Sequence, residues 1–281
     1  MTITAPQLET RLAFAVEIAR QAGEQTLELF RTTNLDVDRK SDGSPVTAAD
    51  RAAEKLLRQR IGAQFPDDAI LGEEFDETPG TSGFRWVLDP IDGTKAFISG
   101  VPLYTTLVAV LHDDKPQIGV IFAPAANEMV YAARGLACWH VLGAAEPRRS
   151  AVSSVEKLEN AVCLTSSVRS FTTERPAYRS DTDARPVYDR LESACRITRT
   201  WGDGFAYLLV ATGRAEIAID PAMSLWDAAA LQPIIEEAGG QFFDWQGRPT
   251  VHSEEAVATN GKLAGQVQAL IKGEGRRRKA D

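Results

Sequence analysis

The sequence predicts a mixed α/β protein that forms either one large domain or two closely packed lobes. Its 281 residues exceed the usual size of a single domain. Segments whose apolar residues recur at helical spacing alternate along the chain with short β-rich runs, which are bounded by turn-forming residues. The composition, 44% hydrophobic and 25% charged, is that of a globular protein with a substantial core.

The N-terminal segment predicts two helices joined by a loop. From about Pro6 to Phe30, apolar residues recur at helical spacing. The residues expected on the buried face are Leu12, Val16, Ala19, Gly23, Leu27 and Phe30. The stretch 38–50 contains glycine and proline and predicts turns. Thr47 is expected to cap a second helix. The apolar residues of that helix are Ala49, Ala53, Leu56, Leu57 and Ile61.

Several strands are predicted next. Short strands are expected at 69–71 and 84–88. The runs TTLVAVLH (105–112) and PQIGVIFAP (116–124) lie on either side of DDK, which predicts a hairpin turn. One more strand is predicted within NEMVYAARG (127–135).

The pattern loosens around residues 143–160, where alanine, serine and charged residues dominate. We therefore expect a boundary between an N-terminal lobe, residues 1–145, and a C-terminal lobe, residues 146–281.

The C-terminal lobe is expected to alternate again between strands and helices. A strand is predicted at 161–165, followed by a poorly periodic region to about Pro186 and a short helix. A helix beginning near Asp203, a strand in AEIAID (215–220) and a helix from about 225 to 238 complete the prediction.

Charge and cysteine content disfavour several classes of function. The net charge of −8 argues against broad binding to nucleic acid or to an anionic membrane. The basic segment 273–281 is expected to be a solvated tail. The three cysteines are far apart and lack metal-ligand spacing, which predicts reduced thiols in a cytoplasmic protein. The N-terminus has no signal pattern, and no apolar run approaches membrane-spanning length.

Two carboxylates, Asp89 and Asp92, follow the apolar run WVL in WVLDPIDGTKAF (86–97). Three interpretations are open for them: a solvated turn, a helix cap, or ligands for a hard cation. The proline between them favours extended geometry, so Asp89 projects from the strand end. Gly93 and Thr94 open a predicted helix whose free N–H groups suit a phosphate.

Two further acidic groups occupy similar positions. Glu73 and Glu74 follow the short strand at 69–71, and Asp227 opens an apolar helix. Each alone is explained by a solvated loop or by a helix N-terminus. Together the three groups favour a cation site. Oxygen ligands without paired His or Cys select Mg²⁺ or Mn²⁺ over Zn²⁺.

The motifs SDGSPVTAAD (41–50), GEE (72–74), DPIDGT (89–94) and WDAAA (226–230), in this order, resemble the inositol monophosphatase family of Mg²⁺-dependent, lithium-sensitive phosphatases. The resemblance spans nearly the whole chain. It implies the layered αβαβα sandwich of the superfamily that also contains fructose-1,6-bisphosphatase. It further implies a homodimer and an active site between the lobes.

The resemblance also implies a set of metal ligands. Glu73, Asp89 and the backbone carbonyl of Ile91 would bind a first Mg²⁺, and Asp89, Asp92 and Asp227 would bind a second. Asp89 would then bridge the two ions. A looser third ion would depend on Glu73 and water. Asp92 and Asp227 would also face the substrate.

The remaining motif residues would act on the reacting groups. By the same resemblance, Asp50 and Thr94 would orient and deprotonate the attacking water, with Glu73 contributing through its metal. The amides of Gly93 and Thr94 would hold the phosphate. Asp50 has a second interpretation, because its spacing from Thr47 is that of a capping box. The metals would activate the water and stabilise the leaving alkoxide. No histidine is needed, and core or surface roles are expected for all three.

Two acids of the C-terminal lobe, Asp203 and Asp220, are expected to select the substrate. By resemblance, the residues at these two places face the alcohol of the ester. Two carboxylates favour a cationic substrate, because they offer charge-assisted hydrogen bonds. The stretch 198–247 resembles the histidinol-phosphatase branch of the family, whose substrate is L-histidinol phosphate. That branch is expected to carry a Cys or similar residue where this chain has Gly204. Each acid is also explained as an ordinary helix-start or strand-end residue.

Three alternatives remain open at this point. The closest is a broader inositol-, sugar- or nucleotide-phosphate phosphatase of the same fold. A non-enzymatic regulator that binds protein or RNA is a second alternative. The third is a structural cation site that only joins the lobes.

Overall fold

The computed structural model describes residues 3–32, 37–40, 44–172 and 184–273. Its helices are α1 (Ala5–Thr26), α2 (Ala48–Gln64), α3 (Thr94–Ile98), α4 (Arg185–Ala194), α5 (Gly204–Ala211), α6 (Leu225–Ala228), α7 (Leu231–Glu237) and α8 (Ala264–Ile271). Its first strands are β1 (Val37–Arg39), β2 (Pro45–Thr47), β3 (Ala69–Gly72), β4 (Phe84–Asp92), β5 (Thr105–His112), β6 (Lys115–Ala123) and β7 (Glu128–Ala133). The remaining strands are β8 (Cys138–Leu142), β9 (Arg148–Arg149), β10 (Val162–Leu164), β11 (Ile197–Arg199), β12 (Ile217–Asp220), β13 (Gln241–Phe243) and β14 (Ala256–Thr259).

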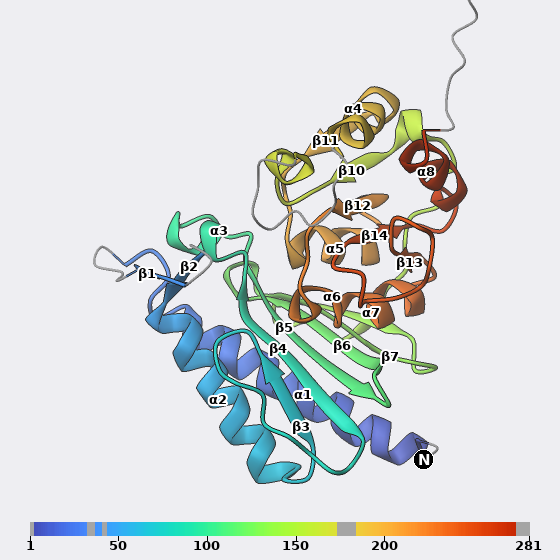
Figure 1. Cartoon of the computed structure of the whole chain (residues 1–281). Coiled ribbons are helices and arrows are strands. Elements are labelled where there is room, and N and C mark those ends of the chain that lie inside the picture. The colour runs from blue at the N-terminus through green and yellow to red at the C-terminus, as the bar shows by residue number, and fades with distance from the viewer. Residues whose placement is uncertain (1–2, 33–36, 41–43, 173–183, 274–281) are drawn as a thin grey trace, which may run out of the picture.

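Helices and sheets alternate in layers (Figure 1). Helices α1 and α2 cover one face of a seven-stranded sheet, and α5, α6 and α7 lie between that sheet and a five-stranded sheet. Helices α4 and α8 cover the far face of the second sheet. This is the αβαβα sandwich that the sequence predicts.

The seven-stranded sheet has the strand order β3-β4-β5-β6-β7-β8-β9, and all neighbours are antiparallel except the parallel pair β3–β4. Its side chains alternate between two cores. Trp86 and Leu88 pack with α1 and α2, whereas Val87 packs with α5 and α7. Because both faces are covered, β4 to β7 contain few polar residues. The predicted hairpin joins β5 to β6, and Asp113 and Asp114 form its turn with φ of 48° and 62°.

Helix α1 forms, but it ends at Thr26 and not near Phe30, so Leu27 lies beyond its last residue and is exposed. Ala19 and Gly23 are buried as expected, whereas the rest of the buried apolar face is formed by Leu8, Ala15, Ile18 and Ala22. Small residues let the helix lie close to the sheet. A β-carbon on Gly23, for example, would lie 2.5 Å from the Phe122 ring. Close approach therefore decided the face more than side-chain hydrophobicity did.

The stretch 38–50, predicted as turns, contains two paired strands. β1 pairs antiparallel with β2, with Val37 opposite Thr47. The prediction missed them because each strand has only three residues and no alternating apolar pattern. Thr47 caps α2 as predicted, and its hydroxyl accepts a hydrogen bond from the Ala49 amide.

The five-stranded sheet has the order β11-β10-β12-β14-β13, in which β10 is parallel to both of its neighbours. The predicted strands at 161–165 and 215–220 are β10 and β12, and the helix expected near Asp203 is α5. Strands β8, β9, β11, β13 and β14 and helix α8 were not predicted, since they are short and weakly periodic.

The helix predicted from 225 to 238 is two helices, α6 and α7. Pro233 explains the break, because its ring clashes with the carbonyl four residues earlier and it has no N–H to donate there. That residue is Ala229, directly after α6. Beside the break, the Ala230 carbonyl lies against Gly119 of β6, where a β-carbon would overlap it.

The two sheets share one buried core that includes Leu107, Ala206 and Leu231. The first sheet ends with β9, just beyond the boundary predicted at residue 145, and that division stays a prediction. The basic tail lies outside the described residues from 274 onwards. Among the helices that the structure describes, none has the length and hydropathy needed to cross a bilayer.

The histidines and cysteines lie in core or surface positions. His140 is buried against Glu128, with 2.6 Å between Nε2 and Oε1, and His112 is buried with its ring against Phe84. His252 is exposed. All three cysteines are free thiols, two of them buried.

Candidate active site

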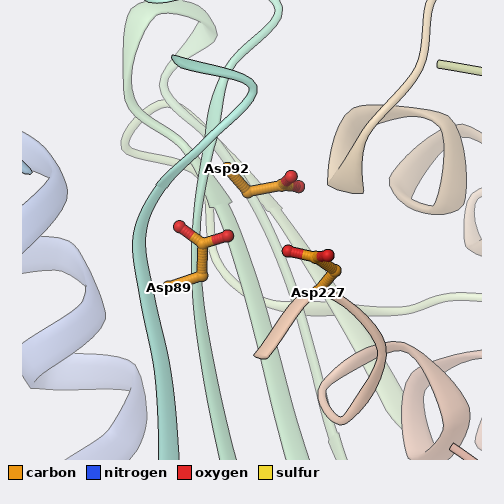
Figure 2. Close-up of side chains that lie close together, drawn as sticks. All are labelled: Asp89, Asp92 and Asp227. Atoms are coloured by element: carbon orange, nitrogen blue, oxygen red, sulfur yellow. The ribbon is translucent and has the colours of Figure 1, made fainter. Parts of the chain in front are cut away.

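Strand β4 does not end before its acids, as the sequence predicted, but continues to Asp92. Asp89 lies opposite Leu107 of β5 and Asp92 lies opposite Thr105, so three steps on β4 match two on β5. This is the pattern of a β-bulge. In a regular strand, residues three apart point to opposite faces. Because of the bulge, both carboxylates turn toward the same space (Figure 2).

A third carboxylate comes from the C-terminal half of the chain. Asp227 lies in the first turn of α6 and forms a capping box, in which the Ser224 amide donates to Asp227 Oδ2 over 2.7 Å. Its carboxylate faces Asp89 and Asp92 (Figure 2). One oxygen from each of the three lies within 4.8 Å of the others. Asp227 is therefore both a helix-start acid and part of the cluster.

Burial and mutual repulsion make this cluster costly without a cation. Burial raises the pKa of Asp89 well above its ordinary value, and the charges of Glu73, Asp92 and Asp227 raise it further. Burial also raises the pKa of Asp92, with Asp203 and Asp227 adding to the effect. The pKa of Asp227 rises to about 7, mainly through burial. Uncompensated buried charge is what a divalent cation relieves.

Asp50 joins the cluster from α2. Its Oδ2 accepts hydrogen bonds from the amide and hydroxyl of Thr47, at 2.8 and 2.6 Å, so the capping-box interpretation holds. Its Oδ1 is buried and has no hydrogen-bond partner among the described residues. Burial raises the pKa of Asp50, and so does the charge of Glu73. The cap thus uses one oxygen and leaves the other without a partner, in a carboxylate whose charge acts on Asp89.

Glu73 lies beside the cluster, and a lysine that sequence reasoning did not select holds it there. Lys40 Nζ lies 2.7 Å from Glu73 Oε1 and 2.6 Å from Glu74 Oε1. Burial by itself lowers the pKa of Lys40, but hydrogen bonds from its ammonium to both carboxylates raise it overall. The lysine therefore stays charged and balances acids that would otherwise repel one another.

The turn after β4 brings the predicted phosphate-binding residues next to these acids. Gly93 has φ 87° and ψ 41°, a left-handed conformation that suits glycine, and it precedes the first residue of α3. The Thr94 hydroxyl donates to the Ile91 carbonyl over 3.1 Å. Ile91 itself is buried beside Phe97 and Tyr104.

Comparison with known proteins identifies the family. The model of the inositol monophosphatase family matches residues 7–274. The chain belongs to this family.

Relatives in sequence and structure agree with that assignment. A histidinol-phosphatase of Chlorobaculum parvum is 41% identical over 95% of this chain and 98% of its own, and one of Mycobacterium tuberculosis is 40% identical over 91% and 95%. An inositol monophosphatase structure from Zymomonas mobilis matches with a TM-score of 0.80 and 30% identity, over 96% of this chain and all of its own. This family member is therefore a phosphoric monoester hydrolase.

The residues present fit the metal dependence of the inositol monophosphatase family. The clustered side chains offer oxygen atoms alone, which suits a hard divalent cation. The unpartnered Oδ1 of Asp50 and the lysine between Glu73 and Glu74 both indicate a place where positive charge is required.

In this family member, the first residue of α5 contacts the cluster. The Gly204 amide donates to Asp92 Oδ2, and the Thr105 hydroxyl donates to the same oxygen over 3.1 Å. A β-carbon at Gly204 would lie 2.7 Å from Asp92 Oδ2 and closer still to Thr105 Oγ1. At this position, where the histidinol-phosphatase branch is expected to have a Cys, any side chain would have to displace Asp92 or Thr105 from the arrangement seen here.

Asp203 and Asp220 lie in the same region but differ in their surroundings. Asp220 is buried, and its carboxylate accepts hydrogen bonds from the Ser166 amide (2.8 Å), the Thr165 hydroxyl (3.1 Å) and the Tyr207 hydroxyl (3.1 Å). Asp203 is partly exposed, and its amide donates to Ser166 Oγ over 2.9 Å. Sequence reasoning did not select Ser166 or Tyr207, because no motif marks them.

Proposed function

We propose that this phosphatase hydrolyses L-histidinol phosphate, using Mg²⁺ held by Asp89, Asp92, Asp227 and Glu73. The observation that carries the choice of substrate is the position of Asp203. Its Oδ2 lies 2.9 Å from where a β-carbon of Gly93 would be, beside the turn predicted to hold the phosphate. A carboxylate this close to the phosphate end suits a substrate with an ammonium group near its ester. It repels an anionic alcohol and gains no charge-assisted hydrogen bond from an uncharged one.

The backbone of Asp203 supports a functional role for this residue. It has φ 56° and ψ −158°, a region that residues other than glycine rarely adopt and that costs on the order of 1–3 kcal/mol. Such strain is retained when the surrounding contacts impose it. Here the Asp203 amide is held by Ser166 and the Gly204 amide by Asp92.

The charge state of Asp203 fits a cationic partner. Burial raises its pKa to about 6, and the nearby charge of Asp220 adds to this effect. At neutral pH the carboxylate is therefore mostly ionised. An ammonium group bound against it would lower that pKa further, since an opposite charge stabilises the ionised form. The names of the relatives from Chlorobaculum parvum and Mycobacterium tuberculosis support the same substrate.

The chain's own residues divide the work of hydrolysis. Bound Mg²⁺ ions supply charge neutralisation of the phosphoryl group and a water of lowered pKa. Asp50 and Thr94 would orient the attacking water, and the free Oδ1 of Asp50 would take the proton that the water loses. The amides of Gly93 and Thr94 would hold the phosphate oxygens. Asp203 and Asp220 line the side on which the alcohol leaves.

A substrate panel tests the assignment. Phosphate release would be measured on histidinol phosphate, inositol 1-phosphate, fructose 1,6-bisphosphate and adenosine 3′,5′-bisphosphate. We expect kcat/KM on histidinol phosphate to be at least about tenfold higher, which corresponds to about 1.4 kcal/mol of transition-state binding. Equal turnover of inositol 1-phosphate would favour the broader phosphatase, which the structural similarity to inositol monophosphatases supports.

A variant separates the substrate contact from the chemistry. Asp203→Asn removes the charge and retains the side-chain shape, so KM for histidinol phosphate should rise about tenfold or more, with little change for inositol 1-phosphate. Asp189→Asn, at an exposed acid of α4 that pairs with Arg185, is the matched control and should change neither. An equal loss on both substrates would show that Asp203 serves the framework instead.

Two further parts of the proposal are the ions and the assembly. We expect two to three Mg²⁺ per site, with Mn²⁺ as a working substitute, and a homodimer. Metal titration of the purified protein and light scattering at several concentrations measure each directly.

A further inference from the structure

Helix α2 carries a second buried acid that the site described above does not use. Glu54 lies one helical turn after Asp50 and has 0% of its surface exposed. Its Oε2 accepts a hydrogen bond from the Glu74 amide over 2.8 Å, and its Oε1 accepts one from Arg58 Nε over 2.7 Å. Glu54 therefore connects α2 to the residue that follows the predicted metal ligand Glu73.

Arg58 extends this connection along the same loop. Its Nη2 donates to the Phe75 carbonyl over 2.8 Å, and its Nη1 donates to Thr78 Oγ1 over 3.1 Å. Thr78 in turn exchanges two backbone hydrogen bonds with Ile70 of β3, each of 2.8 Å. The backbone just after Glu73 is thus held by two side chains of one helix.

The backbone before Glu73 is held by the sheet. Gly72 pairs with Leu88 in the parallel ladder between β3 and β4, and the Glu73 amide donates to the Leu88 carbonyl over 3.2 Å. The Glu54 carboxylate lies so close to Gly72 that a β-carbon there would overlap it. Glu73 is therefore fixed between a strand on one side and the Glu54–Arg58 pair on the other.

The attraction between the two charges alone gives no reason for a charged pair at this place. A buried ion pair contributes little more than well-packed apolar side chains of similar volume, and often less. The neighbouring positions Leu57 and Ile61 on α2 are apolar and fully buried. What the charged pair provides, and an apolar pair would not, is an acceptor for the Glu74 amide and a donor for the Phe75 carbonyl.

We propose that Glu54 and Arg58 are positioning residues for the metal ligand Glu73. They touch neither metal nor substrate, and they hold the backbone on the C-terminal side of Glu73 so that its carboxylate stays beside Asp89. This inference rests on the proposed role of Glu73 in binding metal. One helix thus supplies Asp50 to the site directly and supports Glu73 through its next turn.

The test measures binding of Mn²⁺ to the substrate-free protein, using the EPR signal of the unbound ion. It therefore does not depend on turnover. The Mn²⁺ sites whose affinity falls in Glu73→Gln are the class of metal sites that depends on Glu73. Glu54→Leu should weaken that class about tenfold or more and leave unchanged the class that depends on Asp227. Glu54→Gln retains an acceptor for the Glu74 amide and should restore binding to within about threefold.

Two controls make the comparison specific. Arg60 lies on the same helix as Glu54. Arg60→Met removes its exposed ion pair with Glu17 of α1 and should leave Mn²⁺ binding unchanged. Adding Glu54→Leu to Glu73→Gln should weaken binding no further than Glu73→Gln alone, since residues that act through one group are not additive. If Glu54→Leu does not fold, Arg58→Met takes its place in both comparisons.

Two outcomes would overturn the inference. If Glu54→Leu and Arg58→Met lower the urea midpoint but leave Mn²⁺ binding unchanged, the pair serves stability and not Glu73. If Glu73→Gln itself does not weaken Mn²⁺ binding, the proposed metal site is wrong and the inference fails with it. The first result leaves the proposed function intact, so the two failures are distinguishable.

Discussion

Gly204→Ala is a small change that probes the contact of α5 with β4 and β5. The new methyl group would meet Asp92 Oδ2 at 2.7 Å and Leu107 Cδ2 at 2.9 Å, and would overlap Thr105 Oγ1. Inserting one methylene-sized group into such packing costs about 1–3 kcal/mol. Alanine's better helix propensity returns at most about 1 kcal/mol of this. We expect a net loss of about 1–2 kcal/mol in the free energy of unfolding.

The effect of Gly204→Ala on activity should be larger than its effect on stability. The new methyl group must displace the Asp92 carboxylate, which belongs to the acidic cluster and is held in place by the Gly204 amide. A displacement of about 1 Å at a reacting centre can cost about 100-fold in rate. We therefore expect kcat/KM to fall about 10- to 100-fold, measured by phosphate release at saturating Mg²⁺.

The matched control is Gly62→Ala, at an exposed position in the last turn of α2. A β-carbon there meets nothing within 4 Å, so only helix propensity changes. It should stabilise the protein by about 0.5–1 kcal/mol and leave kcat/KM unchanged. Urea unfolding would compare the free energy of unfolding of wild type, Gly204→Ala and Gly62→Ala, and equal m-values would show that only stability has changed. Wild-type stability and activity in Gly204→Ala would refute the reasoning, because they would show that this contact is not tight.

Three more predictions follow from the site and its surroundings. Asp50→Asn should retain the Thr47 cap and stay within about 1 kcal/mol of wild type, yet lower kcat about 100-fold in steady-state kinetics, because the water loses its base; an unchanged kcat would remove Asp50 from the mechanism. Adding EDTA should lower the melting temperature of the Mg²⁺-loaded protein, since binding at 100 times Kd stabilises by about 2.7 kcal/mol; Asp227→Asn should lose most of that difference in thermal unfolding. Burial by itself would raise the pKa of Asp244, but hydrogen bonds from Arg248 and Ser253 hold that pKa below its ordinary value. Its stabilisation is therefore present above the unfolded pKa and lost as pH falls through the folded one, so Asp244→Asn should cost about 1–3 kcal/mol at pH 7 and much less near pH 3 in urea titrations.

Local patterns in the sequence were enough to predict most of the elements. Thr47 and Asp50 could be predicted as a capping box, and the DDK turn as a hairpin, because both depend on residues within four positions of one another. Pro233 could have predicted the break between α6 and α7 by the same local argument. The face of α1 could not be predicted, since it depended on how closely the helix approaches Phe122.

The motif residues were also predicted from sequence, but the reason that they meet was not. The sequence places Asp89 and Asp92 three residues apart, a spacing that a regular strand would direct to opposite faces. Only the pairing with β5 shows the bulge that turns both toward Asp227. Nothing near Lys40 or Glu54 in the sequence indicates that their partners are Glu73 and Glu74.

By itself, the order of residues determined most of the helices, the longer strands and which acids are available, because propensity, capping and turn chemistry act over a few neighbouring positions. The tertiary structure decided which of those acids share one site. It did so because the carboxylates of Asp89, Asp92 and Asp227 come within a few ångströms of one another only when both sheets pack on the same layer of helices. That packing is also what excludes water from the acids, raises their pKa values and leaves them in need of a cation.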